Sequence, residues 1–247
     1  METRPRSGRP PMSDAPVLVG CSHGTDDPAG RAAVTSVLDG VRARRPDLDV
    51  REAFVDVQQP EVADVVAEAV RDAGAAAVVP LLLSAGFHVH VDIAAAVADR
   101  PAVASGALGP DDRLVAVLVD RLREAGAAPG DAVVLAAAGS SDHRAVVAVE
   151  AVLDRLRAAW PHGPVTVGYG SAATPSVPDA VAAARAASGG GRVVVAAYLL
   201  APGFFHDRLA LAGADVVTGP LAPDDRVVDV VLDRYAAAVA ELVAQTV

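Results

Sequence analysis

Cysteine, aromatic residues and long hydrophobic runs are all scarce in this chain, and each scarcity excludes a class of protein. The single cysteine, Cys21, excludes an internal disulfide framework and fits a reducing cytoplasm, where we expect the protein to act. No apolar run approaches the roughly 18–20 residues that a membrane-spanning helix needs, so no membrane partner is expected. The formal net charge of −10 argues against a nucleic-acid surface, which would carry a basic face.

The chain does hold enough apolar residues for a large core. They make up 52% of its 247 positions, mostly as Ala and Val, and only 3% of the residues are aromatic. A chain of this length can form one large domain or two of about 110 residues each. The first stretch, 1–15, is basic, then proline-rich and polar, with no hydrophobic segment behind it. We predict a disordered leader there rather than a signal peptide.

An internal repeat favours two similar halves. The segments LGPDDRLVAVLVDRL (108–122) and LAPDDRVVDVVLDRY (221–235) are identical at nine of fifteen positions, at an offset of 113 residues. LLLSAGF (81–87) resembles YLLAPGF (198–204) at an offset of 117, and PVLVGCSHGTDD (16–27) resembles AVVLAAAGSSDH (132–143) more loosely at 116. Duplication explains such nearly constant offsets. We therefore predict two half-domains, 16–127 and 128–247, joined near the Gly-, Pro- and Ala-rich segment 124–131.

Strand and helix signals alternate within each half. In the first half, apolar runs predict strands at 17–21, 50–57, 76–83 and 103–105, and helical patterns predict helices at 31–45, 60–73, 88–98 and 111–125. Such alternation predicts a parallel sheet covered by helices on both faces. The expected fold class is α/β, with two Rossmann-like half-domains, each with a parallel four-stranded sheet, and an active-site cleft between them. Ligands of such sheets gather outside the carboxyl ends of the strands.

Polar residues follow three consecutive strands of the first half. His23 comes after the first strand, Asp56 closes the second, and His88 follows the third, with His90 two residues further on as a supporting residue. Two imidazoles and a carboxylate suit a divalent first-row metal, and a neutral imidazole also accepts protons. Each residue also has a purely structural interpretation, as a turn cap, an N-cap or a helix start. Their conjunction at one sheet edge favours a metal site or an acid–base site.

The second half keeps the scaffold without the imidazole pair. In the repeat, Gly139 takes the place of His23 and Phe205 that of His88, while His206 is shifted from the matching position. A single active site in a cleft between duplicated halves would produce this asymmetry. His206 is interpreted either as a cleft residue or as a surface residue at a helix start.

Three motifs in this order resemble those of a known family. HGTDDP (23–28), AFVDVQQP (53–60) and VVPLLLSAGFHVHVDI (78–93) are similar to HGSRDP, FLELxxP and VPLFLxxGxHVxxDI, the usual motifs of class II chelatases of the sirohydrochlorin (CbiX/SirB) type. The resemblance covers about residues 16–245 and favours the long, duplicated form. It implies two facing α/β half-domains, and insertion of a divalent metal into sirohydrochlorin on the way to sirohaem or cobalamin.

The resemblance also implies roles for individual residues. His23 and His88 would bind the metal and accept the pyrrole protons, and Asp56 would be a third ligand, although the family usually has Glu there. Asp26 replaces the usual Arg, and Thr25 the usual Ser, although the substrate carries eight carboxylates. We expect backbone N–H groups and side chains around the cleft to bind those carboxylates; the candidates are Gly24, Thr25, Ser84, Gly86, His90, Ser140, Ser141 and His206, with Arg144 and Arg208. The metal would be a substrate, Fe²⁺, Co²⁺ or Ni²⁺, which this ligand set does not distinguish.

Other functions compete with this one. No GxxxxGK[ST] loop is present, so no nucleotide is expected. The main alternative is a non-enzymatic metal or tetrapyrrole carrier on the same scaffold, because Asp56 and Asp26 depart from the family pattern. A hydrolase-like α/β enzyme is disfavoured by the lack of a GxSxG motif. Duplication completes the cleft within one chain, so we expect a monomer or a weak homodimer.

Overall fold

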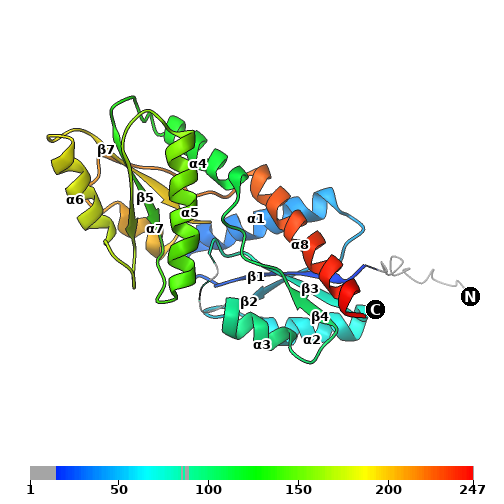
Figure 1. The fold of residues 1–247 in the computed structure, drawn as a ribbon. Helices are drawn as coiled ribbons and strands as arrows, with labels where there is room; N and C mark the ends of the chain where they lie inside the picture. Colours follow the sequence, from blue (N-terminus) through cyan, green and yellow to red (C-terminus); the bar gives the residue numbers. More distant parts are fainter. Residues whose placement is uncertain (1–14, 85, 87–88, 247) are drawn as a thin grey trace, which may run out of the picture.

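Two parallel sheets of four strands each form the framework of the molecule (Figure 1). The computed structural model describes residues 15–84, 86 and 89–246, with only the backbone described at 89, 90 and 246. Within this part of the chain the strand orders are β2-β1-β3-β4 and β6-β5-β7-β8, and every pairing is parallel. The predicted α/β fold with two four-stranded parallel sheets is therefore confirmed.

Strands and helices alternate as the sequence pattern indicates. The first sheet contains β1 (Val17–Ser22), β2 (Val50–Phe54), β3 (Ala76–Pro80) and β4 (Ala102–Ala104), and the second contains β5 (Ala132–Ala137), β6 (Val165–Tyr169), β7 (Val193–Tyr198) and β8 (Val216–Val217). The α-helices are α1 (Pro28–Arg44), α2 (Val62–Ala73), α3 (Ala94–Val97), α4 (Asp112–Glu124), α5 (His143–Ala159), α6 (Val177–Ala187), α7 (Phe204–Leu209) and α8 (Asp225–Thr246). A short π-helix, η1 (Val89–Ile93), leads into α3, where the sequence predicts one continuous helix.

The pairing register shows how the two halves correspond. Leu18 in β1 lies opposite Val50 in β2, and Val133 in β5 lies opposite Val165 in β6. The halves therefore match at an offset of 115 residues in this region (18 to 133, 50 to 165). The two loops that follow β1 and β5 occupy the same place in their sheets.

This register corrects one sequence-based correspondence. Gly24 and Gly139 occupy the same left-handed backbone position, with φ of 89° and 86°, so the residue that stands in the place of His23 is Ala138 and not Gly139. The sequence comparison was wrong by one residue because Ala-rich and Val-rich strands align almost equally well in neighbouring registers. A glycine with positive φ is a firmer landmark, since other residues rarely adopt that conformation.

The last helix of each half covers the sheet of the other half. Helix α8 contacts β3 and β4 of the first sheet and packs along α1, whereas α4 contacts β7 of the second sheet and packs along α5. Figure 1 shows the same exchange, with α4 beside α5 and α8 beside α1. The boundary 16–127/128–247 stays a prediction about the sequence repeat, while in space the two halves interlock.

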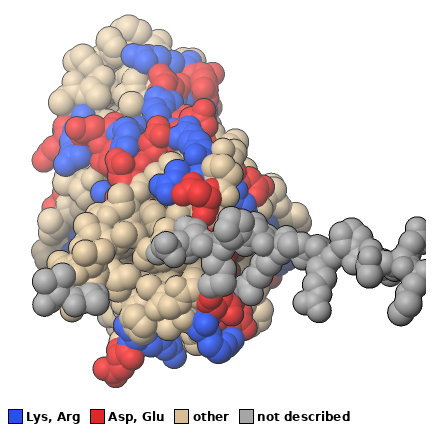
Figure 2. All heavy atoms as spheres, turned by 90° about the vertical axis from the view of Figure 1, so that its right-hand side faces the viewer, with Lys and Arg blue, Asp and Glu red and all other residues tan. Residues whose placement is uncertain are grey.

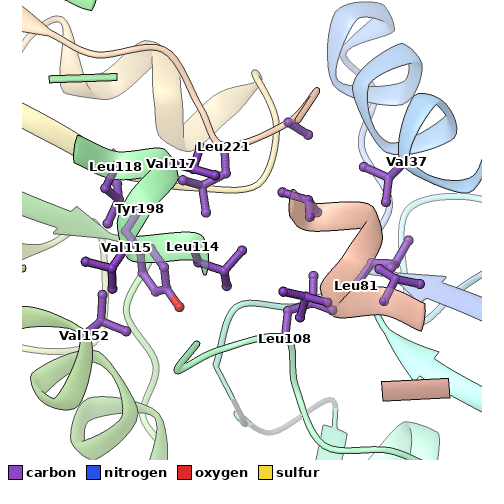
Figure 3. Close-up of a cluster of buried hydrophobic side chains, with 14 of the residues drawn as sticks. Val37, Leu81, Leu108, Leu114, Val115, Val117, Leu118, Val152, Tyr198 and Leu221 are labelled. Carbon is purple, nitrogen blue, oxygen red and sulfur yellow. The ribbon is translucent and has the colours of Figure 1, made fainter. Parts of the chain in front are cut away.

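The exchange creates one central core between the sheets. Its largest cluster joins residues of α1 and α8 to residues of α4, α5 and β7, and Figure 3 shows Leu114 and Leu118 of α4 next to Tyr198 of β7. Smaller clusters fill the outer faces, beneath α2 and α3 on the first sheet and beneath α6 and α7 on the second. Because the central cluster spans both halves, it fixes how the two sheets face each other.

The surface carries both signs of charge. Figure 2 shows one face, on which basic and acidic side chains lie interspersed. Surface arginines of the described residues form short-range ion pairs, such as that of Arg45 with Asp47 at 2.7 Å. None of the helices in the described residues has an apolar stretch long enough to cross a membrane.

Candidate active site

A cleft of about 1040 Å³ opens at the carboxyl ends of the two sheets. Its floor includes the segment 81–83 after β3 and the matching segment 198–200 of the second half, and its walls come from the loops after β1 and β5. Parallel α/β sheets bind ligands at this edge, because the loops there can vary without disturbing the strands. The volume lies at the upper end of the range for small-molecule pockets.

His23 stands on the first-half wall of this cleft. All six residues of β1 are buried, and the chain surfaces at His23, whose exposed side chain lines the cleft. The backbone N–H of Asp56 donates to the His23 carbonyl at 3.2 Å, which continues the pairing of β1 with β2 one step beyond the strands. The predicted juxtaposition of His23 and Asp56 at neighbouring strand ends is thus present in the backbone.

Close contact between these two loops requires glycine at position 24. A Cβ on Gly24 would lie 2.5 Å from the Asp56 carbonyl oxygen, and the residue has a φ of 89°. The second half repeats the arrangement, with Gly139 against the carbonyl of Ser171. The imidazole of His23 is therefore carried by a turn whose backbone is narrowly constrained.

The Asp56 carboxylate has a local partner. It is exposed, its Oδ1 accepts the N–H of Val57 at 2.8 Å, and it is not among the residues that line the cleft. Val57 itself adopts a φ of 55°, so the carboxylate supports a tight turn. Its role as a metal ligand stays a prediction.

The third predicted metal ligand, His88, and the supporting residue His90 belong to the segment after β3. His88 lies outside the described residues, and only the backbone of His90 is described, within η1. Among the residues that are described, no three His, Cys, Asp or Glu side chains are grouped so as to hold a metal ion. Of the other residues in this segment that were expected at the site, Ser84 and Gly86 do line the cleft.

Backbone amides at the start of α1 are already hydrogen-bonded. The N–H of Thr25 donates to Oε1 of Gln58 at 2.8 Å, and the N–H of Asp27 donates to Oγ1 of Thr25 at 3.1 Å. Asp27 in turn caps the helix by accepting the N–H of Gly30 at 2.6 Å. The Thr25 amide is thus not available to a substrate carboxylate, contrary to the expectation from the sequence. Gln58, which holds it, lines the cleft and was missed.

The start of α5 repeats this arrangement. The N–H of Asp142 donates to Oγ of Ser140 at 3.1 Å, and Asp142 caps the helix by accepting the N–H of Arg144 at 2.9 Å. The Arg144 guanidinium is paired with the same carboxylate at 2.8 Å. Ser140 and Ser141 line the cleft as predicted. The Arg144 guanidinium, a candidate for binding a substrate carboxylate, is already paired with Asp142.

The charged groups of the cleft are mainly acidic. Asp26, Asp27 and Glu52 line it, and the cation among its described lining residues, Arg31, is bound to the Thr25 carbonyl and to Asp26. Burial raises the pKa of Glu52 above its ordinary value, opposed by the charge of Arg42 and a hydrogen bond from Thr35. Such a field attracts metal cations and offers little to an acidic ligand. Glu52 was missed in the sequence, where its one signal is a carboxylate inside the strand VREAF.

His206 lines the cleft, and its ring is hydrogen-bonded to the backbone of the second half. Its Nε2 lies 3.0 Å from the carbonyl oxygen of Thr218, and it lines the cleft. A carbonyl can only accept, so Nε2 must carry the proton in this contact and Nδ1 is the nitrogen without one in the neutral ring. Of the two interpretations of this residue, the cleft residue is the one that its position supports.

Two groups near the cleft are structural. The Tyr198 hydroxyl donates to the Leu83 carbonyl at 3.1 Å across the two halves, and burial raises its pKa. Cys21 is fully buried, and burial, followed by the negative charge of Asp92, raises its thiol pKa to about 12. A thiol with that pKa is not ionised at neutral pH, and the thiolate is the form that binds metals. Cys21 is therefore a core residue.

The two walls touch each other in matching contacts. Gly86 of the first half lies against Oγ of Ser140, where a Cβ would come within 3.2 Å. Gly203 of the second half lies against Oγ1 of Thr25, where a Cβ would come within 3.4 Å. Thr25 and Ser140 are equivalent at the 115-residue offset, so the halves meet around an approximate two-fold axis. The cleft is built by both halves together.

Two facing parallel sheets, joined around a cleft at their carboxyl ends with an imidazole on one wall, define a bilobal α/β protein of the class II chelatase type. The sequence model of the CbiX family matches residues 17–125 and again residues 132–238. The chain therefore belongs to the CbiX family, in the long, duplicated form of a CbiX/SirB-like chelatase. No curated protein sequence matches it.

Solved structures share the whole fold at low sequence identity. SirB from Bacillus subtilis with Fe³⁺ is 21% identical with a TM-score of 0.77, over 93% of this chain and 97% of that one. SirB from Bacillus subtilis subspecies spizizenii in complex with cobalt is 20% identical with a TM-score of 0.72, over 91% and 95%. DR2241 from Deinococcus radiodurans, a multi-domain protein with structural similarity to chelatases, is 20% identical with a TM-score of 0.65, over 90% of this chain and 55% of that one. At these identities the likeness shows the fold.

Proposed function

We propose that this protein inserts a divalent metal, Fe²⁺ or Co²⁺, into sirohydrochlorin without a nucleotide. The observation that carries the proposal is the His23 imidazole, which lines a cleft between two halves that both match the CbiX family. The fold-level likeness to SirB structures with Fe³⁺ and with cobalt supports it further. The cleft, of about 1040 Å³, lies at the upper end of the range for small-molecule pockets and so suits a large ligand.

The reaction exchanges one metal dication for two protons. Two pyrrole N–H bonds of the ring break, two metal–nitrogen bonds form in their place, and two further ring nitrogens donate lone pairs. A neutral imidazole beside the ring is a suitable acceptor for a leaving proton, because its pKa is ordinarily close to neutrality. We assign this role to His23, with His88 as its partner from the third strand end.

The described residues also suit delivery of the metal. Asp26, Asp27 and Glu52 give the cleft a negative field that concentrates cations. A metal held by two imidazoles and one carboxylate, His23, His88 and Asp56, would keep open coordination positions and could be passed on to the ring. Holding metal and ring in one cleft turns a bimolecular encounter into an oriented one.

Turnover distinguishes an enzyme from a carrier. Catalytic amounts of protein would be incubated anaerobically with sirohydrochlorin and Fe²⁺ or Co²⁺, with and without ATP, and the absorbance change on metallation would be followed. We expect many turnovers per protein, faster than the uncatalysed reaction and unchanged by ATP. A change that stops at one equivalent of protein would identify a metal or tetrapyrrole carrier, and a rate equal to the protein-free control would refute the proposal.

A further inference from the structure

Two exposed phenylalanines line the cleft on the wall of the second half. The chain has only four Phe, yet Phe204 and Phe205 are adjacent at the start of α7, with 66% and 36% of their surface exposed. Exposed aromatic side chains that share one cleft are typical of sites that bind a flat apolar surface.

The two rings are held in a defined arrangement. Their centroids lie 5.5 Å apart with an interplanar angle of 77°, which is an edge-to-face contact. Phe205 packs directly over Gly170, where an added Cβ would come within 2.9 Å of its ring. Gly203, the residue before Phe204, touches Thr25 of the opposite wall. The pair is therefore anchored on its own half and lies near the loop that carries His23.

The guanidinium of Arg208 lies against one ring of the pair. The Arg208 guanidinium carbon lies 5.4 Å from the centroid of the Phe204 ring. All 21 basic residues of the chain are arginines, and each of the others within the described residues has a hydrogen bond or an ion pair. Among the described residues the Arg208 guanidinium has neither; it lies against the Phe204 ring, next to the cleft but not among the residues that line it. A guanidinium in this state can pair with a carboxylate without first giving up another partner.

We propose that Phe204, Phe205 and Arg208, here called the aromatic rim, bind the planar face of the tetrapyrrole and one of its peripheral carboxylates. The inference rests on the proposed function and extends it to substrate recognition. Stacking on a conjugated ring covers the exposed phenyl surface, and the guanidinium adds positive charge beside a cleft whose described cation, Arg31, is already paired with Asp26. The two phenylalanines of the rim lie on the second-half wall with Arg208 beside them, and His23 lies on the first-half wall.

Ring binding measured apart from metal binding tests the rim. Metal-free sirohydrochlorin would be titrated into the protein and followed by absorbance and fluorescence, and Co²⁺ binding without the ring would be measured by calorimetry. For the double variant Phe204→Ala/Phe205→Ala we expect roughly tenfold weaker ring binding, the scale of one aromatic contact plus its buried area, with unchanged Co²⁺ binding. The thermal midpoint should fall slightly, because Phe205 also packs over Gly170. In turnover the loss should appear in KM more than in kcat.

Conservative and matched variants separate stacking from general surface effects. Phe204→Trp should keep ring affinity, since it keeps an aromatic face. Leu211→Ala should leave it unchanged, because Leu211 is 84% exposed just beyond α7 but does not line the cleft. Arg208→Gln should weaken ring binding and reduce its dependence on salt, while Arg208→Lys should restore much of the dependence because the charge returns.

The outcomes separate the rim from the proposed function. If the wild-type protein metallates the ring and the double variant binds it with wild-type affinity, the rim is refuted and the chelatase function stands. If the wild-type protein neither binds nor metallates the ring, both fail. If the double variant changes only the sedimentation behaviour, the phenylalanines are a contact between copies of the chain and the inference is wrong.

Discussion

The two halves of this protein share a backbone and differ at the residues that carry chemistry. At equivalent loop positions the first half has His23 and Asp56, and the second has Ala138 and Ser171. The constrained turn residues are kept in both halves, including the positive φ of Gly24 and Gly139. The geometry of the strand ends is thus preserved in both halves, while the second wall lacks the residues to which the proposed metal chemistry is assigned. That wall could then become a surface for the other substrate.

The largest expected effect concerns the imidazole that only the first half retains. His23→Ala should lower kcat by about 100-fold or more, the scale of a lost general base, with little change in thermal midpoint. The mirror change Ala138→His, made in the His23→Ala background, should not restore turnover, because the second wall lacks the companion residues. The measurement is the anaerobic metallation assay. Near-normal turnover of His23→Ala would show that the asymmetry between the walls is not catalytic.

A smaller effect is expected where Tyr198 crosses between the halves. Gly109 corresponds in the repeat to Ala222, and Tyr198 corresponds to Leu81. A Cβ on Gly109 would overlap the Tyr198 hydroxyl and lie 2.5 Å from the Leu83 oxygen. Gly109→Ala should therefore lower the free energy of unfolding by about 3 kcal/mol, as overpacking does.

Removing the hydroxyl tests the cause of this effect. In a Tyr198→Phe background, Gly109→Ala should cost about 1 kcal/mol, which gives a coupling of about 2 kcal/mol in a double-mutant cycle from urea unfolding. Ala222→Gly serves as the matched control in the second half, with a cost near that of an ordinary Ala-to-Gly change. Equal costs of Gly109→Ala in both backgrounds would mean that the hydroxyl does not impose the glycine.

The carboxylate at the second strand end is expected to matter less than His23. Asp56→Asn keeps an oxygen that can accept the Val57 N–H but removes the charge, so a metal ligand and a turn residue give different results. We expect about tenfold weaker Co²⁺ binding by calorimetry, with an unchanged thermal midpoint. Asp56→Ser copies Ser171 of the second half and should behave similarly. If Asp56→Asn bound Co²⁺ as tightly as wild type, Asp56 would have only its structural role in the turn at Val57.

The smallest effect concerns the acid in the cleft floor. Glu52 corresponds to Val167 at the 115-residue offset, and burial raises its pKa in the folded state. A raised carboxyl pKa gives stability that is present below the ordinary value of about 4.3 and is lost as pH rises through the folded-state value. Glu52→Val should therefore gain about 1–2 °C in thermal midpoint relative to wild type between pH 4 and pH 7. If the difference in thermal midpoint between Glu52→Val and wild type did not change between pH 4 and pH 7, ionisation of Glu52 would not affect stability in that range.

Sequence patterns sufficed for the fold and for the strand ends that carry His23 and Asp56. Apolar runs, Pro and Gly at element ends, and the repeat all predicted the same two parallel sheets. They did not predict the exchange of α4 and α8, because the two helices begin with similar apolar patterns and either could cover either sheet. Packing in the central core decides between them.

Parts of the site depended on contacts that no local pattern contains. The bond from the Thr25 amide to Gln58 joins residues 33 positions apart, and the grouping of Glu52 with the cleft depends on which strand face looks inward. The aromatic rim was overlooked for a similar reason. Two Phe at a helix start are ordinary in sequence, and their exposure and the free guanidinium of Arg208 become visible only in three dimensions.

The exchanged helices also affect how the chain can fold as it is synthesised. The inner face of the first sheet, at β3 and β4, is covered by α8 (Asp225–Thr246), which leaves the ribosome long after those strands. The first half therefore cannot bury that face when its own residues are complete, unlike an ordinary N-terminal domain. The apolar surface of β3 and β4 stays uncovered until α8 has been synthesised, so the two halves become stable together.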